Sequence, residues 1–135
     1  MADHAIAHAK TAAHEADYAN HPKDRGGETW RGIARKFWPH WPGWGKVDAA
    51  KKVLGLPESV LQVSPKARKM LSQHLAADAE LQQMVLVFFK HEFWDVLHLD
   101  EQPRQTIAEN IYDEAVNAGE KPTRAMVERA LAAMV

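Results

Sequence analysis

Two carboxylates and one hydroxyl lie close together in the first quarter of the sequence, where an alanine-rich stretch gives way to a turn-rich one. Glu15 falls at the end of an expected helix, and Asp24 and Thr29 follow in the next segment. A helix end holds a carboxyl group rigidly, while a loop can bend back and bring other polar groups near it. Such groups can protonate a leaving oxygen, stabilise positive charge and position a water molecule. We therefore take Glu15, Asp24 and Thr29 as the candidate catalytic residues.

Each of these residues suits a different part of an acid-catalysed hydrolysis. Glu15 is the expected general acid, because partial burial against Tyr18 and Trp30 would raise the pKa of its carboxyl. Asp24, in a polar loop, is expected to stay ionised and to stabilise positive charge or orient water. Thr29 is suited to positioning water. The alternative is ordinary helix-end and turn chemistry, since Asp favours turns and acidic residues are common on surfaces.

The sequence around these residues resembles a known signature. Residues 15–33 read EADYANHPKDRGGETWRGI. A family of phage and bacterial N-acetylmuramidases carries E-G-G-Y, then five residues, then D-x-G-G-x-T-x-x-G-I. The residues in register with it are Glu15, Tyr18, Asp24, Gly26, Gly27, Thr29, Gly32 and Ile33. The chain departs from the signature at Ala16 and Asp17, which replace its first two glycines.

The resemblance implies both a fold and an activity. The fold would be mainly α: a lysozyme-like helical domain with a long loop or small β-hairpin after the first helix. The activity would be that of a lysozyme-type peptidoglycan hydrolase, an N-acetylmuramidase with a glutamate general acid, as in phage or prophage endolysins. The Glu15, Asp24 and Thr29 order also resembles the catalytic trio of tailed-phage lysozymes.

Substrate contacts are expected from the same segment. Gly26 and Gly27 permit a close backbone approach to a ligand. Tyr18 belongs to the signature, and Trp30 offers a flat indole that can stack on a sugar and line a groove. We expect the remaining tryptophans of the loop to pack in the core: Trp38, Trp41 and Trp44.

Two later helical segments resemble other parts of the family. FKHEFWD, at residues 89–95, is similar to F-Y-K-x-E-Y-W-D, and YDEAVNAG, at residues 112–119, is similar to F-D-x-A-V-N-x-G. We interpret Glu92 as a structural carboxylate or a support of the site. Asp113 and Asn117 are interpreted as a buried scaffold for the active-site loop, because buried polar groups need partners. The alternative for Asn117 is contact with substrate.

Composition excludes several classes of protein. A length of 135 residues suits one domain, and the absence of cysteine excludes disulfides, thiolate metal sites and cysteine nucleophiles. Seventeen basic and eighteen acidic residues give a net charge of −1, which provides no general attraction to nucleic acid or anionic membranes. We expect a single domain over residues 1–135, a monomer that binds peptidoglycan glycan strands without nucleic acid, membrane insertion or a cofactor.

No metal site is expected. His4 and His8 have the spacing of two ligands on one helix face, but no third ligand lies beside them in the sequence. A solvated helix face is the preferred interpretation. His91 and Glu92 do not fit a zinc protease, because Asp95 occupies the position of the second histidine.

The termini lead to expectations about localisation. The first ten residues have neither a basic n-region nor an apolar h-region, and no run of 18 apolar residues occurs. We expect synthesis in the cytoplasm without a signal peptide, and action on the cell wall after release by another agent. Many family members continue into a C-terminal peptidoglycan-binding-like part, which we expect to be short or absent here.

Hydrophobic periodicity predicts the helices. The first, over residues 3–17, is expected to bury Ile6, Ala9, Ala13 and Ala16. A loop with a small hairpin near 24–33 follows, with a short helix over 33–37. Further helices are expected over 47–54, from 65 after an N-cap at Ser64, over 78–94, over 103–118 and from 122. The apolar stripe of the helix over 78–94 is expected to contain Leu81, Val85, Phe88 and Glu92, and that of the helix over 103–118 to contain Ile107, Ile111, Ala115 and Ala118.

Two other classes of function remain open. The departure from the signature at Ala16 and Asp17 is compatible with a non-catalytic module that binds peptidoglycan or assists secretion. A helical protein-interaction domain without affinity for glycans is the third hypothesis. Release of new reducing ends from purified peptidoglycan separates the enzyme from both.

Overall fold

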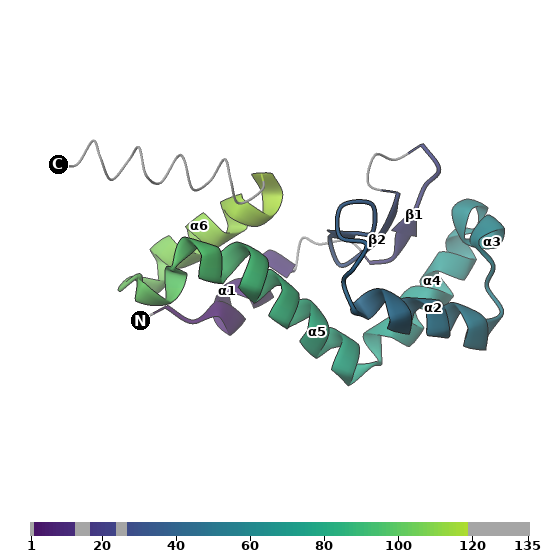
Figure 1. Cartoon of the computed structure of the whole chain (residues 1–135), viewed down its shortest axis with the longest axis horizontal. Helices are drawn as coiled ribbons and strands as arrows, with labels where there is room; N and C mark the ends of the chain where they lie inside the picture. The colour runs from purple at the N-terminus through teal and green to yellow at the C-terminus, as the bar shows by residue number, and fades with distance from the viewer. Residues whose placement is uncertain (1, 13–16, 24–26, 119–135) are drawn as a thin grey trace. The chain divides into compact units, whose positions relative to one another are not determined.

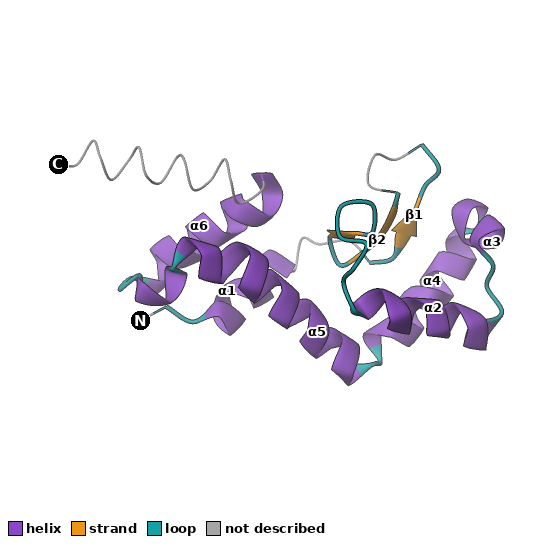
Figure 2. Cartoon of the chain, in the orientation of Figure 1, coloured by secondary structure: helices purple, strands orange, loops and turns teal. Residues whose placement is uncertain are grey.

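The computed structural model describes residues 2–12, 17–23 and 27–118 (Figure 1). Helices dominate, and one small three-stranded sheet accompanies them (Figure 2). The chain forms two compact units: a first unit of Met1–His14 with Leu86–Val135, and a second unit of Glu15–Val85. The mainly α prediction is therefore confirmed, while the single-domain prediction stays a prediction.

The first unit is built around two helices from opposite ends of the sequence. Helix α1, His4–Ala12, packs along α6, Gln105–Ala118. The backbone N–H groups of Ala5 and Ile6 donate to the Asp3 carboxylate, which caps the start of α1. Helix α5, Ala79–Phe89, belongs to this unit from Leu86 onward. It continues as a π-helix, Lys90–Trp94, which is followed by two 3-10 turns, Asp95–Leu97 and Leu99–Glu101.

The buried face of α1 differs from the predicted one. Its buried residues are His4, Ala7, His8 and Thr11, whereas Ile6 is half exposed and Ala9 is exposed. The face with His4 and His8, which was predicted to be solvated, is therefore the face that packs in the core. Polar side chains are buried there because α6 presents hydrogen-bonding partners to them.

The π-helix changes which residues of the central helix are buried. Leu81, Val85 and Phe88 are buried, as predicted. The π-helix inserts an extra residue into the helical repeat. Trp94 is consequently buried, five positions after buried Phe89, while the predicted next residue of the stripe, Glu92, is only partly buried.

Helix α6 begins two residues later than predicted, and its buried stripe shares Ala115 with the predicted one. Ala108, Tyr112 and Ala115 are fully buried, whereas Ile107 is partly exposed. The small alanine side chains allow α1 to approach closely, and the aromatic ring between them fills the interface. Packing against α1 therefore decides the stripe, and the prediction from periodicity is confirmed at Ala115 and wrong at Ile107.

The second unit contains the sheet. Strands β1, Ala19–Asn20, β2, Glu28–Trp30, and β3, Ile33–Ala34, are antiparallel in that order. The β2–β3 turn has positive φ at Arg31 (50°) and Gly32 (84°), the geometry of a type I′ hairpin. The predicted hairpin is confirmed, but the short helix expected over 33–37 is replaced by β3 and a turn.

Three helices support this sheet: α2, Gly43–Leu54, α3, Glu58–Val63, and α4, Pro65–Ala76. Helix α2 starts earlier than predicted, because buried Trp44 belongs to its first turn and donates its indole N–H to the Trp38 carbonyl. It ends at Gly55, whose φ is 65°, as the sequence indicates. The hydroxyl of Ser64 accepts a hydrogen bond from the Ala67 N–H, which confirms the predicted N-cap.

Candidate functional site

The small sheet carries the one proposed catalytic residue that the structure describes. Thr29 is the middle residue of β2, with Ala19 and Ala34 as its Cα partners on the two neighbouring strands. Glu15, Asp24 and Gly26 lie outside the described residues, as does the helix predicted from 122. Their arrangement around Thr29 therefore stays a prediction.

Gly27 directly precedes β2. Its φ is +60°, and a Cβ built there would meet no atom within 4 Å. The left-handed backbone conformation, rather than crowding, therefore accounts for a glycine at this position. Open space beside its backbone is compatible with the predicted close approach of a ligand.

Tyr18 and Trp30 belong to the core of the second unit. The Tyr18 hydroxyl donates to Glu28 Oε2 at 2.6 Å and accepts from Asn20 Nδ2 at 3.0 Å. Burial, and then the Glu28 carboxylate, raise the pKa of the Tyr18 hydroxyl, so the phenol remains neutral. Trp30 has no exposed surface, and its indole Nε1 has no hydrogen-bond partner among the described residues. Neither side chain is in the exposed position expected of a groove-lining residue, and contact with sugar stays a prediction for both.

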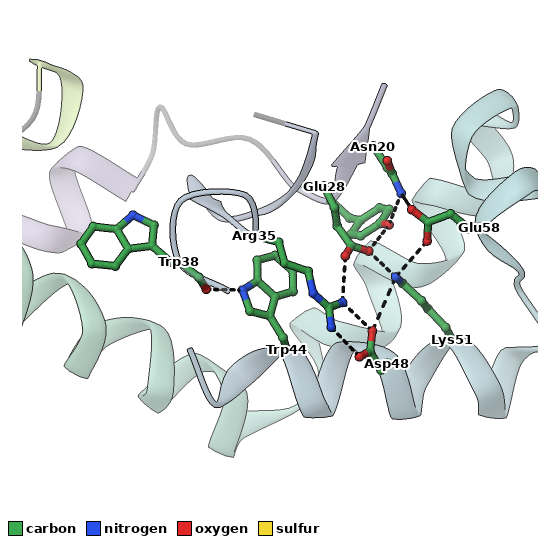
Figure 3. Close-up of polar contacts among 9 residues, drawn as sticks. Asn20, Glu28, Arg35, Trp38, Trp44, Asp48, Lys51 and Glu58 are labelled. Atoms are coloured by element: carbon green, nitrogen blue, oxygen red, sulfur yellow. Dashed lines mark hydrogen bonds and ion pairs between the residues drawn. The ribbon is translucent and has the colours of Figure 1, made fainter. Parts of the chain in front are cut away.

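Glu28 is the centre of a charged network that fastens the sheet to the helices below it (Figure 3). One carboxylate oxygen accepts from Arg35 Nη1 at 2.9 Å, and the other accepts from Lys51 Nζ and from the Tyr18 hydroxyl. The side chain of Glu28 is 9% exposed and that of Lys51 is 13% exposed. Two cations and a phenol thus share one largely buried carboxylate.

The electrostatic environment keeps Glu28 ionised. Burial alone would raise the pKa of its carboxyl, but hydrogen bonds from Lys51, Tyr18 and Arg35 outweigh that effect and hold the pKa below its ordinary value of 4.5. A carboxyl that stays ionised cannot donate a proton near neutral pH. Glu28 is therefore unsuited to the general acid role, and the assignment of that role to Glu15 stays a prediction.

The network extends outward through a second carboxylate on each side. Arg35 donates two hydrogen bonds of 2.8 Å to Asp48, and this pairing, more than its contact with Glu28, raises the pKa of the guanidinium. On the other side, Asn20 Nδ2 donates to Glu58 Oε1 at 2.6 Å. Figure 3 shows Arg35 between Glu28 and Asp48, and Lys51 between Glu28 and Glu58.

Sequence reasoning did not find Glu28. It occupies a variable position of the signature, and its partners Arg35 and Lys51 lie 7 and 23 residues further along the chain. Tyr18 belongs to the signature, but the signature does not indicate that its hydroxyl pairs with Glu28. A contact between the strand residue Glu28 and the helix residue Lys51 leaves no recognisable pattern among the neighbouring residues of the sequence.

Among the described residues, Asp113 contacts helix α1 and Asn117, and the predicted support of the active-site loop stays a prediction. Asp113 Oδ1 accepts from the Thr11 hydroxyl of α1 at 3.1 Å, and Asp113 Oδ2 accepts from Asn117 Nδ2 at 3.3 Å. Asn117 is exposed, so the predicted buried pair is wrong. Contact between Asn117 and substrate stays a prediction. Glu92, interpreted as structural, lies in the π-helix with its carboxylate 3.0 Å from His91 Nδ1.

His4 and His8 both contact the Tyr112 hydroxyl, through Nε2 at 3.1 Å and Nδ1 at 2.7 Å. Burial, together with the neighbouring His8 and Lys90, lowers the pKa of His4 to about 4, against opposing effects of Asp95 and Asp100. The His4 side chain is therefore neutral at pH 7. Over residues 2–12, 17–23 and 27–118, no group of three or more His, Asp or Glu side chains is placed to hold a metal ion.

The fold and the signature together define a class, the lysozyme-like glycoside hydrolases. Residues 8–119 match the family model described as Glycosyl hydrolase 108, and the chain belongs to this family. No curated protein and no solved structure matches the chain. Within the described part of the chain, no helix has the length and apolar character needed to cross a membrane.

Proposed function

We propose that this protein is a peptidoglycan hydrolase that cleaves the glycan strand as an N-acetylmuramidase, in the manner of a phage or prophage endolysin. The observation that carries the proposal is the family match over residues 8–119, which contains the whole signature from Glu15 to Ile33. In this proposal the enzyme is made in the cytoplasm and acts on the cell wall after release.

The proposed mechanism assigns one role to each residue. Glu15 donates its proton to the glycosidic oxygen as the bond to the anomeric carbon breaks. Asp24, as a carboxylate, stabilises the positive charge that develops on that sugar or orients the attacking water. Thr29 holds this water through its hydroxyl. The water adds to the anomeric carbon, and its proton passes to a carboxylate.

The position of Thr29 supports its role. Side chains alternate across a strand, so the Thr29 side chain lies on the face of β2 opposite Glu28 and Trp30. That second face is not occupied by the buried network. Tyr18, Trp30, Gly26, Gly27 and Asn117 are the proposed substrate contacts.

Replacement of the general acid is the first test. We expect Glu15→Gln to lower the release of reducing ends from purified peptidoglycan by about 100-fold or more, the usual contribution of general acid catalysis, and to abolish lysis of permeabilised Gram-negative cells. Folding, followed by circular dichroism, should be unchanged. Mass spectrometry of the products identifies the bond that is cut.

Glu80→Gln is the matched control, because Glu80 lies in the same unit and its side chain is 76% exposed. It should retain full activity. Wild-type lysis by Glu15→Gln would remove Glu15 from the mechanism. Binding of the wild-type protein to peptidoglycan without new reducing ends would instead favour the non-catalytic module.

A further inference from the structure

We propose that Glu28 is a positioning residue: its network fixes β2 from one face so that the Thr29 hydroxyl on the other face is held in its working orientation. This inference rests on the proposed function. Glu28 touches neither substrate nor the reacting atoms in this role, and acts only through Thr29.

The first step of the argument concerns geometry. Lys51 comes from α2, Tyr18 lies just before β1, and Arg35 follows β3. These three donors approach the two carboxylate oxygens of Glu28 from three separate segments of the chain. A carboxylate held by three donors has a fixed position and a fixed plane.

The second step concerns what a buried charged network contributes. Burying an ion pair costs desolvation free energy, and apolar residues of similar volume often stabilise a protein as well or better. What a fully paired polar network supplies is one specific arrangement of its members. The side chains of Glu28 and Lys51 are each less than one-seventh exposed. Their pairing is therefore better explained by the fixed orientation that it gives to β2 than by a gain in the stability of the protein.

The third step concerns the strand itself. β2 has three residues, and its partners β1 and β3 have two each. So short a sheet has few backbone hydrogen bonds to define its position. Glu28 and buried Trp30 anchor both ends of β2 on the same face. Thr29, between them, is thereby aimed at the opposite face.

The test is a double-mutant cycle between Glu28 and Thr29, measured with purified peptidoglycan. We expect Glu28→Gln, which places an amide against two cations, to lower kcat about 10-fold with an apparent KM within about twofold. Glu80→Gln, the same change at an exposed glutamate that also faces a lysine, should leave both constants unchanged.

The second arm repeats Glu28→Gln in a Thr29→Ala background. If Glu28 acts through Thr29, the substitution will change kcat less than twofold there, because the group that it positions is already absent. Thr29→Ala and the double mutant are assayed at raised enzyme concentration and long incubation, so that slow release of reducing ends is still quantified. If Glu28→Gln does not fold, Asp48→Asn, which releases Arg35 from its second carboxylate, takes its place in the cycle.

Three results would overturn the inference: an equal fall in kcat in both backgrounds, no fall in kcat with Glu28→Gln, or a fully active Thr29→Ala. A purely structural role predicts the first of these, since loss of stability lowers activity regardless of Thr29. Failure of the proposed function is a separate outcome, because the wild-type protein would then release no reducing ends.

Discussion

At the residue scale, the Tyr112 hydroxyl forms hydrogen bonds with the imidazoles of both His4 and His8. A hydroxyl has one hydrogen to donate, so at most one of the two imidazoles accepts from Tyr112 and the tautomers of His4 and His8 set which. His4 also meets the rings of Trp94 and Tyr112 edge-on, with centroids 5.3 and 5.0 Å away. One oxygen atom therefore organises the polar core between α1 and α6.

Tyr112→Phe tests this arrangement. The substitution keeps the ring but leaves two buried imidazole nitrogens without this partner, which should lower the free energy of unfolding by about 1–3 kcal/mol. Urea denaturation measures the change. An unchanged midpoint would show that the hydroxyl contributes nothing to the packing of the two helices.

At the element scale, the β2–β3 turn fixes the register of the strand that carries Thr29. A type I′ turn needs positive φ at both central residues. Arg31 adopts this conformation with its guanidinium 4.9 Å from the centroid of the Trp30 ring, and Gly32 adopts it without steric cost. The turn thus depends on the glycine.

Gly32→Ala should therefore destabilise the protein by about 1–2 kcal/mol, since a side chain at φ 84° meets the backbone. Thermal denaturation measures this change. Gly45→Ala is the control: a Cβ there meets no atom within 4 Å and Gly45 lies in α2, so the melting temperature should stay the same or rise. Equal effects of the two substitutions would contradict the turn assignment.

At the scale of the whole molecule, the two units differ in their response to acid. In the first unit, the pKa of His4 falls from 6.5 to about 4 on folding. The unfolded chain therefore binds a proton more readily, and the contribution of neutral His4 is complete above pH 6.5 and is lost as the pH falls toward 4. Full protonation of His4 in the folded protein lowers the free energy of unfolding by about 3 kcal/mol, because one pKa unit corresponds to about 1.4 kcal/mol.

In the second unit, the lowered pKa values of Glu28 and Asp48 act at lower pH. Their ordinary values are 4.5 and 3.8, so their contributions are present above these values and are lost only as the pH falls below them. Of His4, Glu28 and Asp48, only His4 thus weakens the protein between pH 6.5 and 4.5.

Hydrogen exchange at pH 6.5 and 5 tests this difference between the units. After correction for the intrinsic pH dependence of exchange, amides of α1 and α6 should lose protection at pH 5, while those of α2 and α4 should keep it. His4→Gln, which cannot take up a proton in this range, should reduce the difference. Equal loss of protection in both units would contradict the role of His4.

Local sequence patterns determined the features that depend on neighbouring residues. The Ser64 cap, the stop at Gly55 and the hairpin followed from residue types whose backbone preferences act over one turn. The signature of residues 15–33 and the family followed from fixed spacing. Such features need no knowledge of what packs against them.

Tertiary structure decided what depends on distant partners. The face of α1 that is buried depends on the hydroxyl of Tyr112, more than 100 residues later, because a paired histidine can replace an apolar residue in the core. The central place of Glu28 depends in the same way on Lys51 and Arg35. Burial and pairing are properties of the folded neighbourhood, and no local spacing in the sequence encodes them.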